Sequence, residues 1–368
     1  MKRMNVQGFL RLAGSLMVAV FLLNLSRCAL AAEVAPPPLD QAFFVTNLGA
    51  NYVTIYDLKS NGDTAPLANI DGTTVNRVFD SVIRGGSGLD DPLGVALDLA
   101  GNIYVGNMSG GANYTGAIDV FQAGAHGTAT PIAKINGPDT GLYTVKSIAV
   151  DSKGNIYATR QAYLYDRSAP GVNVYPAGST GDVKPTAVIS GPNTGIDNLE
   201  GIAVDSKGSI YVTNNAGSGS ILVFPAGSSG NVRPTAVIGA SKINAVGALA
   251  LDSRANVYVV RLGGSERFRR QTIEIYRAGS SSTDPPIATI SGPKTGLADP
   301  NYTIRGIAVD SNGNIYAVSE GGGRGQPDKV IVYTSGSDGD VGPRATIEGP
   351  QTRLSGAQGI AIGRFAYP

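Results

Sequence analysis

The sequence predicts an all-β protein built as a six-bladed β-propeller with four-stranded antiparallel blades. The chain of 368 residues holds 50 Gly and 21 Pro, which favour turns, and only 15% of its residues are charged. Short runs rich in Ile, Val and Tyr alternate with these turns and have the composition of strands. One strand–turn–strand element also recurs at a spacing of about 50 residues, which is typical of propeller blades.

The repeated unit contains four predicted strands. The first has the pattern small-x-Ala-x-Asp and occupies residues 94–98, 147–151, 201–205, 248–252 and 306–310. A polar turn and a second strand follow it, beginning at residues 102, 155, 209, 256 and 314. The third strand covers residues 118–121, 172–175, 221–224, 273–276 and 330–333, and a Gly/Ser turn leads to a fourth, such as 185–189. Short hairpin connections make each unit one antiparallel blade.

The two ends of the chain predict how the ring closes. Residues 43–45, 53–56 and 65–70 match the second, third and fourth strands of a blade that has no first strand before them. A degenerate first strand stands alone at residues 359–363. We expect this C-terminal strand to complete the N-terminal blade, because a closed ring leaves no unpaired edge between its first and last blades. The count is then six blades.

The repeated pattern resembles that of NHL-repeat propellers. It is similar in particular to bacterial exported propellers whose blades carry Tyr-Pro-Ala-Gly-Ser-x-Gly and Ile-Ser-Gly-Pro-x-Thr-Gly motifs, here at residues 175–181 and 189–195. The resemblance covers residues 40 to 365. It implies the propeller fold, and it leaves the function open among binding platforms, sensor domains and lyases.

The N-terminus has the pattern of a secretory signal peptide. Lys2, Arg3 and Arg11 precede an apolar run at residues 12–23, and a small-x-small cleavage signal ends at Ala31. We therefore predict a signal peptide at 1–31, cleaved near Ala31, a Pro-rich lead at 32–40 and a single propeller domain at 41–365. The apolar run is too short to span a bilayer. The expected location is secreted or periplasmic, with no transmembrane anchor.

Cleavage also changes the charge and the thiol chemistry. It leaves 25 basic residues against 28 acidic ones and removes Cys28, the one cysteine. The mature domain is slightly acidic, whereas nucleic-acid binding needs a strongly basic surface, so we expect no nucleic-acid partner. We expect a monomer held together by its core, without disulfides.

The repeat register places a candidate ligand site on one face of the ring. Loops before the first strands and after the second strands open on that face, and their residue types differ between blades while the flanking Gly, Ala, Asp and Tyr recur. The positions before the first strands include Leu93 and Gly247, and Ser319 follows a second strand. The predicted ligand-binding ring consists of Lys146, Arg160, Glu200, Arg261, Arg305, Gln358, Asn47, Asn107 and Asn214.

This predicted ring is rich in cations, which favours an anionic ligand. The alternative is a solvated rim in which nearby acids neutralise the cations. Variable loops on the same rim add aromatic side chains suited to stacking on a flat ligand and a local basic patch. These residues are Tyr163, Tyr165, Phe268, Arg267, Arg269 and Arg270.

Catalysis is the less favoured interpretation. The single histidine, His126, falls in an outer turn, so a Ser–His hydrolase or a histidine-dependent lyase has no central base. A Ca or Mg lactonase with oxygen ligands is the remaining enzyme candidate, with Glu200 and the three asparagines of the ring as its nucleus. The Asp151 turn and its copies lack the ligand series of a calcium loop. Asn107 and Asn113 match the glycosylation sequon.

The favoured prediction is therefore an exported binding module without a cofactor. Its ring would recognise an anionic glycan, peptide or protein partner. A metal-dependent lactonase or lyase is the first alternative, and a structural envelope or adhesion protein is the second.

Overall fold

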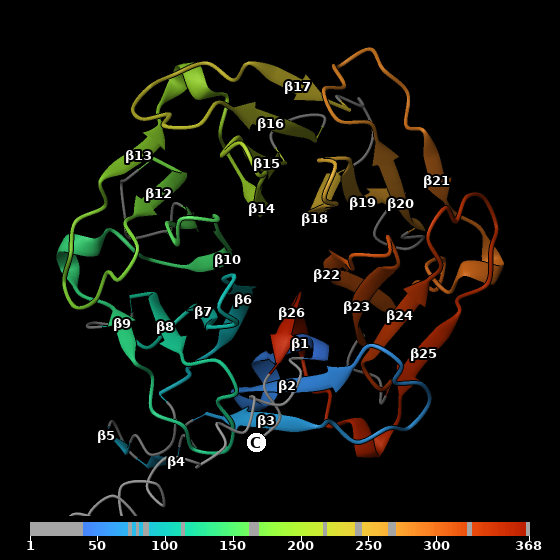
Figure 1. The fold of residues 1–368 in the computed structure, drawn as a ribbon, viewed down its shortest axis with the longest axis horizontal. Coiled ribbons are helices and arrows are strands. Elements are labelled where there is room, and N and C mark those ends of the chain that lie inside the picture. The colour runs from blue at the N-terminus through green and yellow to red at the C-terminus, as the bar shows by residue number, and fades with distance from the viewer. Residues whose placement is uncertain are drawn as a thin grey trace, which may run out of the picture. The chain divides into compact units, whose positions relative to one another are not determined.

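A computed structural model describes residues 40–72, 76–78, 81–83, 88–111, 115–161, 169–215, 219–239, 245–263, 270–321 and 326–365 of the chain. Six four-stranded antiparallel sheets formed by these residues stand around a common centre (Figure 1). The predicted fold class, an all-β six-bladed propeller, is confirmed. Residues 1–39, which hold the predicted signal peptide and most of the lead, lie outside the described ranges.

Each blade runs from an inner first strand to an outer fourth strand. Blade I contains β26 (Ala357–Phe365), β1 (Asp40–Asn47), β2 (Tyr52–Asp57) and β3 (Ala68–Asp71). Blade II contains β6 (Pro92–Leu97), β7 (Ile103–Asn107), β8 (Ala117–Phe121) and β9 (Ala133–Ile135). Blade III contains β10 (Val145–Val150), β11 (Ile156–Arg160), β12 (Gly171–Tyr175) and β13 (Ala187–Ser190).

The other three blades repeat this order. Blade IV contains β14 (Leu199–Val204), β15 (Ile210–Asn214), β16 (Ser220–Phe224) and β17 (Ala236–Ile238). Blade V contains β18 (Ala245–Leu251), β19 (Val257–Gly263), β20 (Arg270–Tyr276) and β21 (Ala288–Ile290). Blade VI contains β22 (Tyr302–Val309), β23 (Ile315–Gly321), β24 (Lys329–Tyr333) and β25 (Ala345–Glu348). A separate hairpin, β4 (Asn76–Val78) and β5 (Ser81–Ile83), was not predicted.

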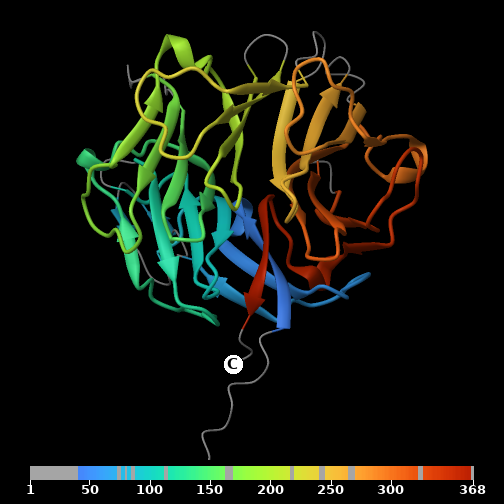
Figure 2. The same cartoon turned by 45° about the horizontal axis from the view of Figure 1, so that its top comes forward.

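Blade I joins the two ends of the described chain. β1 pairs with β26 on one side and with β2 on the other, and Phe43 lies opposite Ile362 in the first of these pairings. Figure 2 shows the C-terminal red strand beside the N-terminal blue strands. The predicted closure, with the last strand completing the first blade, is confirmed.

The core lies between the faces of neighbouring blades. Phe43 and Tyr56 of blade I stack at 4.9 Å between ring centroids, and the Tyr316 ring of blade VI lies 5.5 Å from Phe43. All three side chains are fully buried. Successive side chains of a strand point to opposite faces, so each sheet contributes to two such clusters. The apolar strands therefore bind each blade to both of its neighbours.

Four one-turn 3-10 helices connect successive blades and explain the repeated Gly-Pro-x-Thr motif. They span Pro138–Thr140, Pro192–Thr194, Pro293–Thr295 and Pro350–Thr352. The Tyr175 hydroxyl donates to the Thr140 carbonyl at 2.6 Å, and the Tyr333 hydroxyl donates to the Thr295 carbonyl at the same distance. A buried tyrosine at the end of a third strand thus holds the turn that leads into its own blade.

Candidate functional site

A β-bulge in the first strand of every blade positions the candidate site. In blade III, Lys146 and Ser147 together lie opposite one residue of β11, because Val145 pairs with Arg160 and Ile148 pairs with Ala158. The same irregularity occurs in the other five blades. Bulges redirect a side chain and are frequent beside functional sites. The bulged positions are the six predicted before the first strands: Leu93, Lys146, Glu200, Gly247, Arg305 and Gln358.

Threonine hydroxyls on the second strands stabilise three of these bulges. Thr159 Oγ1 accepts the N–H of Ser147 at 3.0 Å and donates to the carbonyl of the same residue at 3.2 Å. Thr213 Oγ1 accepts the N–H of Gly201 at 2.7 Å, and Thr46 Oγ1 accepts the N–H of Gly359 at the same distance. A bulge leaves backbone groups without ladder partners, and these hydroxyls replace the missing partners.

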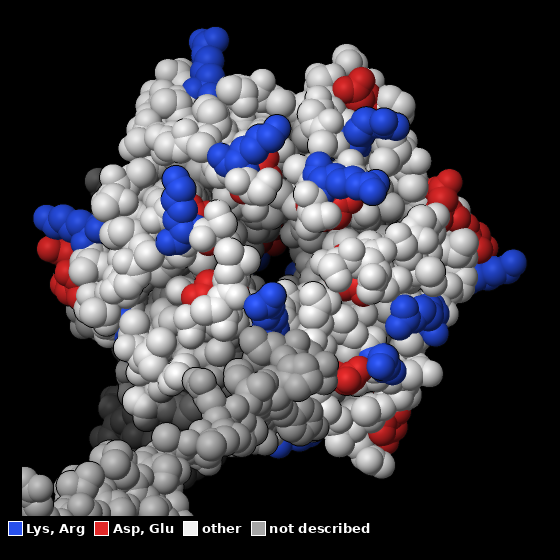
Figure 3. Space-filling model, viewed as in Figure 1, with Lys and Arg blue, Asp and Glu red and all other residues white. Residues whose placement is uncertain are grey.

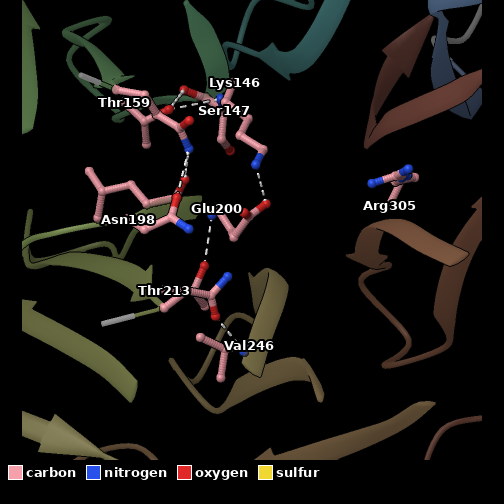
Figure 4. Close-up of polar contacts among 12 residues, drawn as sticks. Lys146, Ser147, Thr159, Asn198, Glu200, Thr213, Val246 and Arg305 are labelled. Atoms are coloured by element: carbon pink, nitrogen blue, oxygen red, sulfur yellow. Dashed lines mark hydrogen bonds and ion pairs between the residues drawn. The ribbon is translucent and has the colours of Figure 1, made fainter. Parts of the chain in front are cut away.

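The six bulges surround a cavity of about 150 Å³ at the centre of the ring. Lys146, Glu200, Arg305 and Gln358 line it, together with Leu93 and Gly247. Figure 4 shows Lys146 and Glu200 pointing toward one another, with Arg305 extending from the far side. The structure therefore brings together four of the nine predicted site residues, from blades I, III, IV and VI. Figure 3 shows that the ring has a central opening on the viewed face, with acidic and basic side chains interspersed around it.

The charged lining residues form ion pairs. Lys146 Nζ lies 2.6 Å from Glu200 Oε2, across the boundary between blades III and IV. Arg305 Nη2 lies 2.7 Å from Glu320 Oε2, a carboxylate on the neighbouring strand β23. The Arg305 side chain is 44% exposed and that of Lys146 is 34% exposed, so solvent weakens both pairs. An acid thus lies beside each of these two cations, as in the alternative of a rim whose cations are neutralised by nearby acids.

The three predicted asparagines lie outside the cavity and have structural contacts. Asn214 Oδ1 accepts the backbone N–H groups of Asp197 and Asn198 at 2.9 and 3.1 Å. Asn107 Oδ1 accepts the N–H of Asp90, and Asn47 Oδ1 accepts the N–H of Ser355. Each asparagine thus holds the loop that enters its own blade. None of the three lines the cavity together with Glu200, the residue with which the alternative interpretation groups them.

Arg261 is also outside the cavity, because its side chain is buried within blade V. Its Nε donates to Glu274 Oε2 at 2.8 Å, and its Nη1 and Nη2 donate to the carbonyls of Gly219 and Gly239. Burial acts to lower the Arg261 pKa, but the bonds to Glu274 and Tyr276 raise it overall, so the guanidinium stays charged. The predicted ligand-binding role is corrected to that of a buried structural cation.

Arg160 likewise makes a hydrogen bond within the protein. Its Nη2 donates to the Ala169 carbonyl at 2.8 Å, and its buried Nε has no partner in the described part of the chain. The structure does not place Arg160 among the cavity-lining residues. The predicted ring thus separates into a central group around the cavity and a structural group at the ends of the second strands.

The predicted loop site falls almost wholly outside the described residues. The residues of this set outside the described ranges are Tyr163, Tyr165, Phe268, Arg267 and Arg269, and Asn113 of the second sequon also lies there. Arg270 is exposed at the start of β20. Asn107 of the first sequon is buried, and its Nδ2 donates to Asp119 Oδ2 at 2.9 Å, so the folded domain does not present this amide for glycosylation. His126 lies exposed in an outer turn, as predicted.

The Asp151 turn shows why its repeated aspartates are structural. Asp151 Oδ1 accepts the N–H groups of Lys153 and Asn155, both at 2.9 Å, and its Oδ2 accepts from the Tyr157 hydroxyl at 3.1 Å. Burial raises the pKa of this carboxyl, but the hydrogen bonds lower it more, so the net shift is downward. Among the described residues, no three His, Cys, Asp or Glu side chains lie together as a metal site would require.

The sequence did not predict the bulges, nor did it identify the two acids that pair with Arg305 and Arg261. Glu320 and Glu274 lie on second and third strands, where they look like ordinary members of the repeat. A partial signal was present, because the third-strand position of Glu274 is apolar in two other blades, as Leu222 and Ile331. The remaining three blades have Thr54, Asp119 and Asn173 there. An acid at such a buried strand position indicates a cation nearby.

Fold and site together define a β-propeller with a small charged cavity at its centre. A solved structure with the same fold is a protein of unknown function from Bacteroides caccae, with a TM-score of 0.57 and 11% identity over 88% of this chain and 98% of that one. The WD40 propeller domain of Doa1 is 13% identical over 86% of this chain and 85% of that domain, with a TM-score of 0.47. No protein-family model and no curated protein sequence matches this chain. In the described residues, no helix is long and apolar enough to cross a membrane.

Proposed function

We propose that the protein is an exported binding module whose central cavity receives an anionic group of its partner. The propeller fold is a rigid scaffold suited to binding, and the signal-like N-terminus and the resemblance to exported NHL-type propellers support export. The observation that carries the proposal is the convergence of Lys146 and Arg305 on one cavity from opposite sides of the ring.

A carboxylate is the group that suits this cavity best. Two cations, Lys146 and Arg305, and one acid, Glu200, line the cavity. Glu320 forms an ion pair with Arg305 but is not part of the lining. An incoming carboxylate would compete with Glu200 for Lys146 and would accept hydrogen bonds from the guanidinium of Arg305. Both cations are partly exposed, so they reach a ligand without unfolding any element. The cavity admits one small group, with the rest of the ligand on the surrounding rim.

The test is binding of two acidic probes to the protein and its variants. Isothermal titration would compare trigalacturonate, an acidic glycan, with triglutamate, an acidic peptide. We expect one of them to bind, and the Lys146→Met and Arg305→Met double variant to lose at least about tenfold in affinity. Lys153→Met is the matched control, because Lys153 is an exposed lysine beyond the other end of the same strand. Equal binding by the double variant and the control would refute the proposed site.

A further inference from the structure

At five of the six blade boundaries, the same pattern of backbone hydrogen bonds joins the outer strand of one blade to a glycine in the next, and we call this pattern the latch. At the boundary between blades II and III, the Gly181 N–H donates to the Lys134 carbonyl at 2.7 Å, and the Asn136 N–H donates to the Gly181 carbonyl at 3.1 Å. The outer strand of one blade thus pairs in parallel with a turn of the next. The glycines of the five latches are Gly62, Gly127, Gly181, Gly230 and Gly339.

The latch needs glycine for a conformational reason. The five latch glycines have φ between 60° and 76°, a left-handed conformation that side chains with a Cβ rarely adopt. Blade V has Ser282 at the equivalent position, and Thr283 follows it. That turn forms an internal hydrogen bond instead, in which the Ser281 N–H donates to Asp284 Oδ2 at 2.7 Å. No latch joins blade IV to blade V among the described residues.

The missing latch leaves the outer edge of β17 open. In blade III, the Val188 carbonyl and the Ser190 N–H point outward and bond Gly230 of the next blade. The equivalent groups in blade IV are the Val237 carbonyl and the Gly239 N–H, for which the described residues supply no partner. Both residues are only partly buried. Figure 1 shows β17 as the outermost strand of its blade, beside blade V.

The open edge is held in a strand conformation and is ready to pair. Ile238 is buried opposite Ile221 of β16, which fixes the register of β17. The Gly239 carbonyl accepts from Arg261 Nη2, which holds the end of the strand against blade V. A fixed strand whose N–H and C=O groups have no partner among the described residues is a template for an added segment.

We propose that the outer edge of β17 docks an extended segment of a partner protein that carries a glycine in the left-handed conformation. The five occupied edges of this protein show which chemistry fits, because each of them is paired with such a glycine. Asp or Asn follows the glycine at residues 62–63, 181–182, 230–231 and 339–340, where its side chain caps a Gly-Pro-x-Thr turn. Thr128 follows Gly127, and neither that boundary nor the one after β17 has such a turn in the described residues, so the glycine is the feature that a docked segment needs. A second copy of this chain is a poor donor, because its latch glycines are already engaged.

The first experiment measures hydrogen exchange at individual backbone amides. The Gly239 amide should exchange much faster than the amides of Asn136 and Ser190, which donate in intact latches. Protection of Gly239 equal to that of Ser190 in the free protein would show that the edge is already occupied and would overturn the proposal.

The second experiment adds a synthetic peptide with the sequence of residues 178–184, Gly-Ser-Thr-Gly-Asp-Val-Lys. We expect saturable binding that slows exchange at Gly239, and no such effect from a control peptide with Ala at its second glycine. Absence of binding at millimolar peptide would overturn the proposal.

A gain-of-latch variant makes the test specific to this edge. Ser282→Gly with Thr283→Asp should form the sixth latch, raise the melting temperature and weaken peptide binding by at least about tenfold. Thr283→Asp alone is the control, because it keeps the serine that prevents the latch. Undiminished peptide binding by the double variant would place the peptide elsewhere. This outcome is independent of the cavity, because Lys146 and Arg305 are unchanged in every variant.

Discussion

Asp182 of blade III caps the 3-10 turn that leads into its own blade. Its Oδ1 accepts the backbone N–H of Asp139 at 2.8 Å. Asn231, Asp340 and Asp63 make the same bond to the three other Gly-Pro-x-Thr turns. Blades II and V have no such turn before them in the described residues, and they carry Thr128 and Thr283 at the capping position. The cap and the turn therefore occur together.

Replacing a cap should weaken the fold by a small, definable amount. Asp182→Ala removes the acceptor for the Asp139 N–H, so we expect the free energy of unfolding to fall by about 1 kcal/mol. Urea denaturation would measure it. Thr128→Ala is the matched control, because this exposed side chain caps no turn of that kind, and its effect should be within about 0.5 kcal/mol of zero. Equal losses in the two variants would contradict the capping role.

Removing the buried cation of blade V should cost far more. Arg261→Ala removes the cation that pairs with Glu274 and leaves the Gly219 and Gly239 carbonyls without this donor, while the Tyr276 hydroxyl still donates to Glu274. We expect a loss of about 3–5 kcal/mol. Chemical denaturation of Arg261→Ala, Glu274→Ala and the double variant forms a thermodynamic cycle. The double variant should be less destabilised than the sum of the single ones. A small effect, like that of the exposed Arg254→Ala, would show that Arg261 is not a structural cation.

The threonine behind a bulge should affect both stability and the cavity. Thr213→Val keeps the shape of the side chain but removes the acceptor of the Gly201 N–H, so we expect a loss of about 1–2 kcal/mol. The Glu200 side chain is carried by the same bulge, and its NMR signals should shift. Blade V has Val260 at this position, which makes Val260→Thr the reverse control with little loss expected. Unchanged stability of Thr213→Val would mean that solvent satisfies the bulge.

Alkaline pH should unfold the ring through its buried tyrosines. Burial, and next the charge of Asp151, raise the pKa of Tyr157 to about 12. Burial and the neighbouring aspartate likewise raise the pKa of Tyr104 and Tyr316 to about 12. The unfolded chain releases these protons near pH 10, while the folded chain keeps them, so stability falls as the pH rises from 10 to 12. Urea midpoints measured from pH 9 to 12 would show this decline.

A tyrosine variant gives the control for the pH series. Tyr157→Phe loses the bond to Asp151 but has no phenol to ionise, so its stability should fall with a shallower slope above pH 10. A slope identical to that of the unchanged protein would show that Tyr157 does not contribute to the alkaline transition.

The fold was predictable because the repeat encodes it directly. Each small-x-Ala-x-Asp strand and the hairpin after it predict the same local structure, and the isolated strand at residues 359–363 predicts how the ring of blades closes. The site was predictable only in part. The repeat register assigned Lys146 and Arg305 to one rim, but the register does not say which side chains turn inward. That direction depends on the bulge, which adds its extra residue to the first strand, whereas Arg160 and Arg261 lie on the second strands that pair with it.

For a related reason, the sequence did not show which acid pairs with which cation. Glu200 reaches Lys146 across a blade boundary, so this contact depends on the assembled ring, whereas Glu320 reaches Arg305 from the paired strand of the same blade and depends on the bulge beside it. Composition and charge gave the correct residue types near the centre. They did not give the distances that turn a cationic rim into a set of ion pairs.

Closure through blade I also makes the first blade depend on the last strand of the described chain. A growing chain that ends before residue 357 contains every strand of blades II to VI, but β1 still has one unpaired side. Asp40 must wait for Phe365, its partner at the far end of the chain. A chain cut shortly before residue 357 would therefore leave one edge of β1 unpaired, and an unpaired edge is a template for association with other chains.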